Sequence, residues 1–225
     1  MKEKPPFGKY DRYKASSYKA YNFKMPERYD TMFWIRLFRL CSLHQEITNE
    51  LNGDLSKLHI LDVGCATGRL LSQFAQAGCQ HLHGIDLAPK ILEVAEKKLS
   101  EYDSSIQLRT ADAEDEIPWP DNSFDVVTLT GVLHHFYRPL DALSEIHRVL
   151  RPNGHLVVIE PWLLPLLQQV TNLYLLIIPH DGDCKFRSPQ GVVRLLHSAS
   201  FAEVRQRRIS RFLFIVVGCK EPLAP

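Results

Sequence analysis

The 225-residue sequence lacks the cysteine patterns that mark disulfide frameworks and small zinc modules. Its five cysteines stand singly at positions 41, 65, 79, 184 and 219, the count is odd, and no two have the C-x-x-C spacing. Scattered free thiols are typical of a reducing compartment. The sequence therefore predicts a cytoplasmic protein without structural disulfides.

A long hydrophobic run is also missing. The most apolar stretch, residues 162–178, is interrupted by proline, glutamine, threonine and asparagine, whereas a membrane span needs about 20 nearly unbroken apolar residues. The basic amino-terminal segment has no apolar core of the kind that signal peptides carry. We therefore expect neither an integral membrane segment nor a signal peptide.

The chain has little net charge, because its 27 lysines and arginines nearly balance its 26 acidic residues. Its formal net charge is +1, which gives no electrostatic reason to expect nucleic acid or an anionic surface as a partner. The charge is unevenly placed, because residues 1–30 hold eight lysines and arginines against four acidic residues. The sequence predicts no nucleic-acid partner, and it gives no indication of an oligomeric state.

From residue 58 onward, short apolar runs alternate with longer helical patterns. This alternation is typical of a parallel sheet with helices on both faces. A tight turn between the last two strands makes one of them antiparallel. The prediction is a Rossmann-like, doubly wound α/β fold with seven mostly parallel strands. The expected strands are 58–63, 81–86, 106–110, 124–130, 155–160, 202–208 and 211–218, and the expected helices are 68–77, 89–101 and 139–150.

Two segments do not fit this alternation. Residues 1–57 are interpreted as an N-terminal helical or cap segment, in which 32–51 reads as an amphipathic helix. The residues before that helix form either a cap over the ligand or a disordered tail. The core, 58–225, carries a cap or lid insertion near 161–187. Its apolar stripe either packs on the sheet or walls a pocket; the stripe consists of Leu163, Leu166, Leu167, Val170, Leu173, Tyr174 and Ile177.

The strongest chemical signal is the run Leu61-Asp-Val-Gly-Cys-Ala-Thr-Gly68, which follows an expected strand and opens a helix. Its small residues let a ligand approach the backbone closely, and the helix start offers free N–H groups. Eighteen residues after Gly68, the next strand ends in Asp86. An acid at this place suits hydrogen bonding to ribose hydroxyls.

A dinucleotide is the weaker candidate ligand. The G-x-G-x-x-G fingerprint would place Ala66 and Arg69 where the second and third glycines belong. Asp62, directly before the turn, disfavours a pyrophosphate but suits a ligand with an ammonium group. A nicotinamide-dependent oxidoreductase therefore stays a less favoured alternative.

The run Asp62–Gly68 resembles motif I of class I S-adenosylmethionine-dependent methyltransferases, D-x-G-C-G-T-G, with Ala66 replacing one glycine. Further segments resemble later motifs of the same family in the same order: Gly84–Asp86, Ala111–Ala113, Phe124–His135 and His147–Gly154. The resemblance covers about residues 58–160. It is typical of the subfamily that includes ubiquinone and menaquinone methyltransferases, and it does not specify a substrate.

The resemblance implies S-adenosylmethionine as cofactor, S-adenosylhomocysteine as product, and in-line methyl transfer to a small-molecule acceptor. It places the methionine moiety at Gly64 and Cys65, with Asp62 at the amino group. It places the ribose at Asp86 and the adenine at Leu87. The remaining cofactor residues that we expect are Ala66, Gly68, Asp112, Ala113, Thr130 and Gly131, together with Tyr21 and Tyr29 from the N-terminal segment.

Two histidines, His134 and His180, are the candidate catalytic residues. Adjacent side chains such as those of His134 and His135 are expected to point apart, so we predict no metal site. The run His180–Cys184 either faces the acceptor or is a polar loop. The Tyr-rich N-terminal segment and the apolar insertion favour a small aromatic or isoprenoid-like acceptor. A non-catalytic cofactor-binding or interaction protein with this fold is the alternative.

Overall fold

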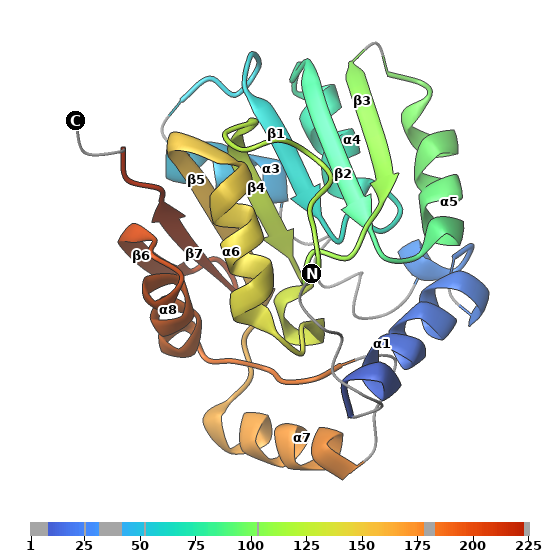
Figure 1. The fold of residues 1–225 in the computed structure, drawn as a ribbon, viewed down its shortest axis with the longest axis vertical. Helices are drawn as coiled ribbons and strands as arrows, with labels where there is room; N and C mark the ends of the chain where they lie inside the picture. Colours follow the sequence, from blue (N-terminus) through green and yellow to red (C-terminus); the bar gives the residue numbers. More distant parts are fainter. Residues whose placement is uncertain are drawn as a thin grey trace.

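The computed structural model describes residues 9–24, 26–31, 42–51, 53–102, 104–177 and 183–222. It contains a seven-stranded sheet in the order β3-β2-β1-β4-β5-β7-β6 (Figure 1). Strand β7 is antiparallel to both of its neighbours, and the other pairs are parallel. The predicted fold class is confirmed. The strands are β1 His59–Val63, β2 His81–Asp86, β3 Ser105–Thr110, β4 Phe124–Thr130, β5 Leu150–Pro161, β6 Ala202–Arg208 and β7 Leu213–Cys219.

Helices cover both faces of the sheet, because the strands alternate apolar side chains toward two separate cores. On one face, α3 (Leu43–Leu51), α4 (Arg69–Gln76) and α5 (Pro89–Leu99) pack on residues such as Ile60 and Val126. On the other, α6 (Pro139–Val149) and α8 (Pro189–Ser198) pack on residues such as Leu61 and Val127. Helix α8 was not among the helices expected from the sequence.

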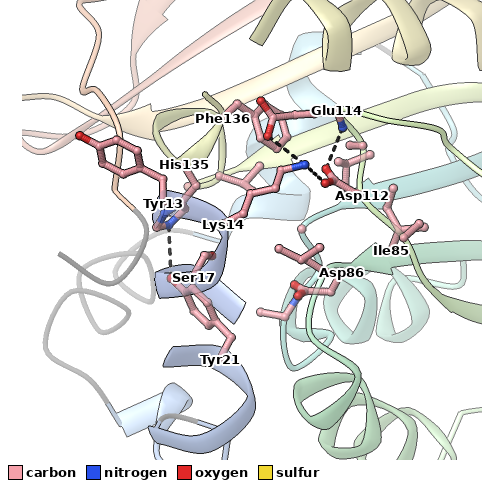
Figure 2. Close-up of a pocket in the computed structure, with 18 of the residues that line it drawn as sticks. Tyr13, Lys14, Ser17, Tyr21, Ile85, Asp86, Asp112, Glu114, His135 and Phe136 are labelled. Carbon is pink, nitrogen blue, oxygen red and sulfur yellow. Dashed lines mark hydrogen bonds and ion pairs between the residues drawn. The ribbon is translucent and has the colours of Figure 1, made fainter. Parts of the chain in front are cut away.

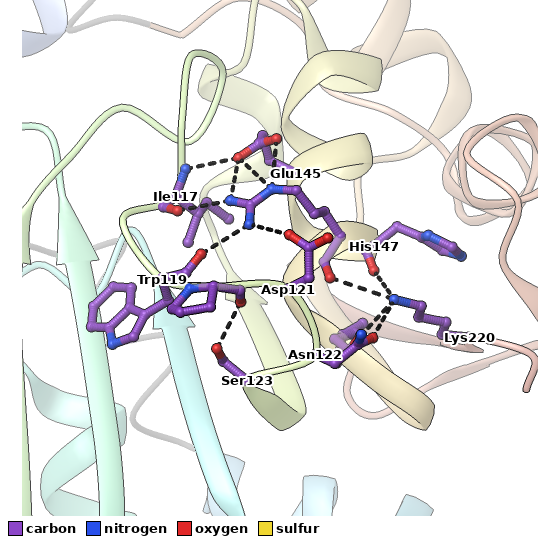
Figure 3. Close-up of polar contacts among 11 residues, drawn as sticks. Ile117, Trp119, Asp121, Asn122, Ser123, Glu145, His147 and Lys220 are labelled. Atoms are coloured by element: carbon purple, nitrogen blue, oxygen red, sulfur yellow. Dashed lines mark hydrogen bonds and ion pairs between the residues drawn. The ribbon is translucent and has the colours of Figure 1, made fainter. Parts of the chain in front are cut away.

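The loop before β4 is fixed to α6 by one guanidinium group. Arg148 donates hydrogen bonds to the carbonyl oxygens of Ile117 and Trp119, each at 2.9 Å. It also pairs with Asp121 and Glu145 at 2.9 and 2.7 Å. Figure 3 shows these partners converging from the loop and the helix. Arg148 belongs to the segment 147–154, which resembles a family motif, and its role in this structure is to hold the loop against α6.

Beside this network, Lys220 caps the carboxyl end of α6. Its ammonium group donates to the carbonyl oxygens of Leu150 and His147 at 2.7 and 2.8 Å, as Figure 3 shows in part. Cations are favourable at helix carboxyl ends, where carbonyl groups lack intrahelical partners. The contact fixes the last strand against the helix that precedes β5.

The N-terminal segment is helical where it is described. Helix α1 (Lys9–Lys19) continues into the π-helical turn η1 (Ala20–Lys24), and η2 covers Tyr29–Thr31. Figure 1 shows α1 beside the carboxyl ends of the parallel strands. Of the amphipathic helix expected over 32–51, residues 43–51 form α3, and 32–41 lie outside the described residues.

The insertion forms helix α7 (Pro165–Ile177), which lies below the sheet in Figure 1. The option that its apolar stripe packs on the sheet is wrong, because Leu166, Val170 and Leu173 are exposed. Among the side chains of this helix that the structure describes, Leu175 is the buried one, and it lies off the expected stripe. Among the described residues, no helix has the length and apolar character needed to cross a membrane.

Candidate functional site

An open pocket lies at the carboxyl ends of β1 to β4, and helix α1 forms its opposite wall. It holds about 720 Å³ of empty space, part of it continuous with solvent. Figure 2 shows Lys14 of α1 reaching toward Asp112, and the Tyr21 hydroxyl directed toward His135. Strand ends at the switch point of a parallel α/β sheet are the usual ligand position in such folds.

The turn after β1 is shaped by Gly64, whose φ is +72°. Its N–H donates to the carbonyl oxygen of Ile85 at 2.8 Å. A Cβ atom added there would lie 2.4 Å from Cγ2 of Val132, in the loop after β4. The position therefore requires glycine for its left-handed backbone and for close packing. The open backbone that results suits the close approach of a ligand such as S-adenosylmethionine.

Asp86 ends β2 at the pocket wall. Its two carboxylate oxygens accept hydrogen bonds from the N–H groups of Ala66 and Ala88, each at 3.0 Å. Burial raises the pKa of Asp86 to about 6, although these two N–H groups act to lower it. The carboxylate is thus held in one orientation at the position where ribose hydroxyls are expected, and it fits that partner.

Asp62 lies beneath the turn and is buried. It accepts a 2.7 Å hydrogen bond from the hydroxyl of Thr128, and burial raises its pKa to about 7. The side chain is not among those that line the pocket. Its place below the glycine turn fits an indirect role, in which Asp62 acts on a ligand through the backbone of the turn or through a water molecule.

The loop after β3 brings two acids to the pocket, Asp112 and Glu114. Lys14 of α1 forms an ion pair with Asp112 and a second with Glu114 at 3.4 Å (Figure 2). Burial lowers the pKa of the lysine. Asp112 was expected from the sequence as a cofactor residue, whereas Lys14 and Glu114 were not expected at this place.

Nine of the thirteen expected cofactor residues line the pocket. Two of them are N-terminal tyrosines, Tyr21 and Tyr29, whose rings lie 6.0 Å apart, and burial raises the pKa of Tyr29. Tyr13, Val132 and Phe136 also line it, so the wall is largely aromatic and apolar. The nine are Tyr21, Tyr29, Gly64, Ala66, Asp86, Leu87, Asp112, Ala113 and Gly131.

The other four, which include Asp62, are not in the lining. Cys65 is buried below the turn, where its sulfur would lie 2.8 Å from a Cβ at Gly84. Gly68, with φ +69°, packs against Leu99. Thr130 ends β4, and its buried hydroxyl has no hydrogen-bond partner among the described residues. These residues shape the backbone of the pocket from behind.

The two adjacent histidines lie in the 3₁₀ turn η3 (Leu133–His135). His135 lines the pocket, where its Nε2 lies 3.3 Å from the Tyr21 hydroxyl. His134, the residue chosen from the sequence, is buried behind it, with Nδ1 2.8 Å from Oε2 of Glu160. Burial acts to lower the pKa of His134, but the Glu160 carboxylate outweighs it and the pKa is raised. His180 lies outside the described residues.

The expectation that the two imidazoles point apart is wrong. Their ring centroids lie 4.3 Å from one another. In a strand, neighbouring side chains alternate between faces, but the tight η3 turn brings them together. The only sequence signal for this turn was the resemblance of Phe124–His135 to a family motif.

Comparisons with known proteins show the family of this chain. A family model described as "Methyltransferase domain" matches residues 61–158. A ubiquinone/menaquinone biosynthesis C-methyltransferase of Roseobacter denitrificans is 31% identical over 173 residues, covering 67% of this chain and 69% of the relative. A demethylmenaquinone methyltransferase of Symbiobacterium thermophilum is 38% identical over 108 residues, covering 45% of this chain and 42% of the relative.

Among solved structures, a SAM-dependent methyltransferase from Aquifex aeolicus superposes with a TM-score of 0.62. It is 21% identical and the match covers 78% of this chain and 88% of that chain, which supports the fold. The chain spans between 42% and 65% of the length of four bacterial demethylmenaquinone methyltransferases that it matches.

Proposed function

Because this chain belongs to the family of S-adenosylmethionine-dependent methyltransferases, we propose that it transfers a methyl group to a small-molecule acceptor. The observation that carries the proposal is the grouping of Gly64, Asp86 and Asp112 in one pocket at the ends of β1, β2 and β3. When bound, S-adenosylmethionine supplies a methyl group already activated by its sulfonium. The protein then needs to bind, orient and exclude water.

The chain's own residues divide this work. Asp86, held by two N–H groups, accepts hydrogen bonds from a ribose. Asp112 accepts one from an adenine amino group, which requires Lys14 to share or leave the carboxylate. Gly64 and Val132 shape the backbone at the methionine end. Tyr13 and Tyr21 exclude water from the opposite wall.

The acceptor that we propose is small and largely apolar, of aromatic or isoprenoid-like character. Tyr13, Val132 and Phe136 give the pocket wall this character, and the names of the two relatives refer to quinones. His135, which faces the pocket beside Tyr21, is the histidine best placed to contact the acceptor. From the sequence, the proposal also includes His180 as a candidate catalytic residue and a cytoplasmic location for the protein.

Transfer of a labelled methyl group from S-adenosylmethionine tests the proposal. The acceptor panel contains demethylated quinones, other phenols and isoprenoid-like compounds, and an Asp86→Ala variant serves as the control. We expect Asp86-dependent labelling of at least one acceptor. Calorimetry that detects binding of NADH and none of S-adenosylhomocysteine would contradict the proposal. Binding of S-adenosylhomocysteine with no labelled product across the panel would favour the non-catalytic alternative.

A further inference from the structure

Three side chains converge at the pocket wall where the chain returns from α7. His134 and His135 come from η3, and Asp183 lies 48 positions after His135 in the sequence. Asp183 Oδ1 lies 3.1 Å from Nδ1 of His135 and 3.7 Å from Nε2 of His134. One donor atom from each of the three residues lies within 4.8 Å of the other two.

These distances match the donor spacing of a metal site. Metal–nitrogen and metal–oxygen bonds of about 2.0–2.2 Å in a tetrahedron place the donors about 3.4 Å apart. The observed 3.1 and 3.7 Å lie on either side of that value. A set of two imidazoles and one carboxylate favours borderline divalent ions such as Zn²⁺, whereas Mg²⁺ and Ca²⁺ favour sites built from oxygen donors.

The second nitrogen of each ring provides an independent observation. Histidines that bind a metal through one nitrogen carry a proton on the other, and an acceptor outside the site usually takes it. Here Nδ1 of His134 lies 2.8 Å from Glu160 Oε2, and Nε2 of His135 lies 3.3 Å from the Tyr21 hydroxyl. Both rings are therefore oriented with Nε2 of His134 and Nδ1 of His135 directed toward Asp183.

The backbone holds Asp183 in this position. The N–H groups of the next two residues, Cys184 and Lys185, both donate to the carbonyl oxygen of His134, at 2.8 and 3.0 Å. The His134 ring also stacks on Phe186, with centroids 4.6 Å apart. The site is thus built between two segments that already contact each other, so little ordering would be needed to bind an ion.

We propose that His134, His135 and Asp183 bind one divalent transition-metal ion of the Zn²⁺ type. Three protein ligands leave a fourth position for a solvent molecule. The ion fastens the segment after α7 to η3. Through the His135 Nε2 contact with Tyr21, it also fixes the ring that faces the pocket and the tyrosine of the N-terminal segment.

The test is calorimetric titration of chelator-treated protein with ZnCl₂, repeated with CoCl₂ so that the absorption of four-coordinate Co²⁺ reports the coordination. We expect one equivalent to bind and the thermal midpoint to rise. Asp183→Asn and His135→Gln should each weaken binding at least tenfold, since even residues behind the ligands change metal affinity about 10- to 100-fold. Circular dichroism verifies that both variants fold.

Two control variants test whether the metal ion binds outside the proposed site. Cys184→Ser removes the thiol next to Asp183, and His81→Gln removes a histidine stacked on His59 on the sheet; both should bind within twofold of the original chain. Failure of Zn²⁺ and Co²⁺ to bind would overturn the proposal. So would binding that survives Asp183→Asn and His135→Gln, or that disappears with Cys184→Ser. None of these readouts requires methyl transfer, so they are independent of the proposed function.

Discussion

The hydroxyl of Tyr13 donates a buried 2.8 Å hydrogen bond to the carbonyl oxygen of Leu175, 162 positions later in the chain. Tyr13 belongs to α1 and lines the pocket, whereas Leu175 is a buried residue of α7. The two segments outside the alternating α/β pattern therefore contact each other beside the pocket. We propose that they act together as its cover.

Replacement of Tyr13 by phenylalanine tests this contact. The loss of one hydrogen bond that leaves a buried carbonyl without its donor costs about 1 kcal/mol, which corresponds to about fivefold faster local opening. We expect faster amide hydrogen exchange in both α1 and α7, measured by mass spectrometry. Tyr18→Phe, at an exposed position of the same helix, is the matched control. Unchanged exchange in α7 would contradict a joint cover.

Asp86→Ala should weaken binding of S-adenosylhomocysteine much more than it weakens folding. Losing hydrogen bonds to a carboxylate costs about 2–3 kcal/mol, which is on the order of 30- to 150-fold in affinity. Calorimetry measures the affinity and thermal melting measures the fold. Glu101→Gln, an exposed acid outside the pocket lining, should change neither. Normal affinity in Asp86→Ala would show that the ribose lies elsewhere.

The affinity for S-adenosylhomocysteine should fall as the pH is lowered from 8 to 5. Burial raises the pKa of Asp86 to about 6 and that of Asp62 to about 7 in the free protein, and the ligand requires both as carboxylates. Below these pH values, binding must displace a proton from each acid. Each displaced proton lowers the affinity about tenfold per pH unit. Calorimetry at several pH values measures the slope, which Asp86→Asn should flatten. A constant affinity would argue against contact with either acid.

The same two groups affect the stability of the free protein with the opposite sign. Their folded-state pKa values lie above the ordinary value of 3.8, so the folded form binds protons more tightly than the unfolded chain. Their contribution is therefore largest below about pH 4 and is lost as the pH rises through 6 to 7. Denaturant unfolding of Asp62→Asn, compared with the unchanged chain between pH 4 and 8, should show a smaller loss of stability in this window.

Gly64→Ala should destabilise the protein more than Gly78→Ala does. Both glycines have positive φ, so each substitution costs about 1–2 kcal/mol in backbone strain. At Gly64 the new Cβ also meets Val132 at 2.4 Å, whereas at Gly78 nothing lies within 4 Å. Overpacking of this kind adds about 1–3 kcal/mol. Denaturant unfolding measures the difference, and a second substitution, Val132→Ala, should recover part of it. Equal losses at the two positions would refute the packing argument.

Arg148→Ala should reduce the free energy of unfolding by about 1–3 kcal/mol, because two loop carbonyl oxygens lose their donor. Cofactor affinity should change little, since the side chain is not part of the pocket lining. Arg151→Ala, which removes a partly exposed pair with Asp125, should cost less than about 1 kcal/mol. A loss of S-adenosylhomocysteine affinity in Arg148→Ala at temperatures where it stays folded would assign the residue a different role.

The sequence by itself determined the parts of this protein that depend on neighbours close in the chain. The alternation of apolar runs fixed the strands, and the turn at Gly64 followed by Asp86 lies within one strand–helix–strand unit. The carboxyl ends of neighbouring parallel strands lie at the same edge of a sheet. For that reason, the sequence could predict that Gly64 and Asp86 lie at one edge. The sequence also predicted seven strands with one of the last two antiparallel, whereas the order of the strands and the choice of β7 as the antiparallel one came from the structure.

Only the tertiary structure decided which distant segments meet. Helix α7 has an amphipathic pattern, yet its expected apolar face is exposed and Leu175 is buried, because a period shows which residues share a face but not what that face contacts. The pairing of Lys14 with Asp112 joins positions 98 apart. The place of His135 in the pocket, and of Asp183 beside both histidines, depends on the η3 turn and on the return of the chain after α7. Such contacts are set by packing across the whole fold, which no local spacing encodes.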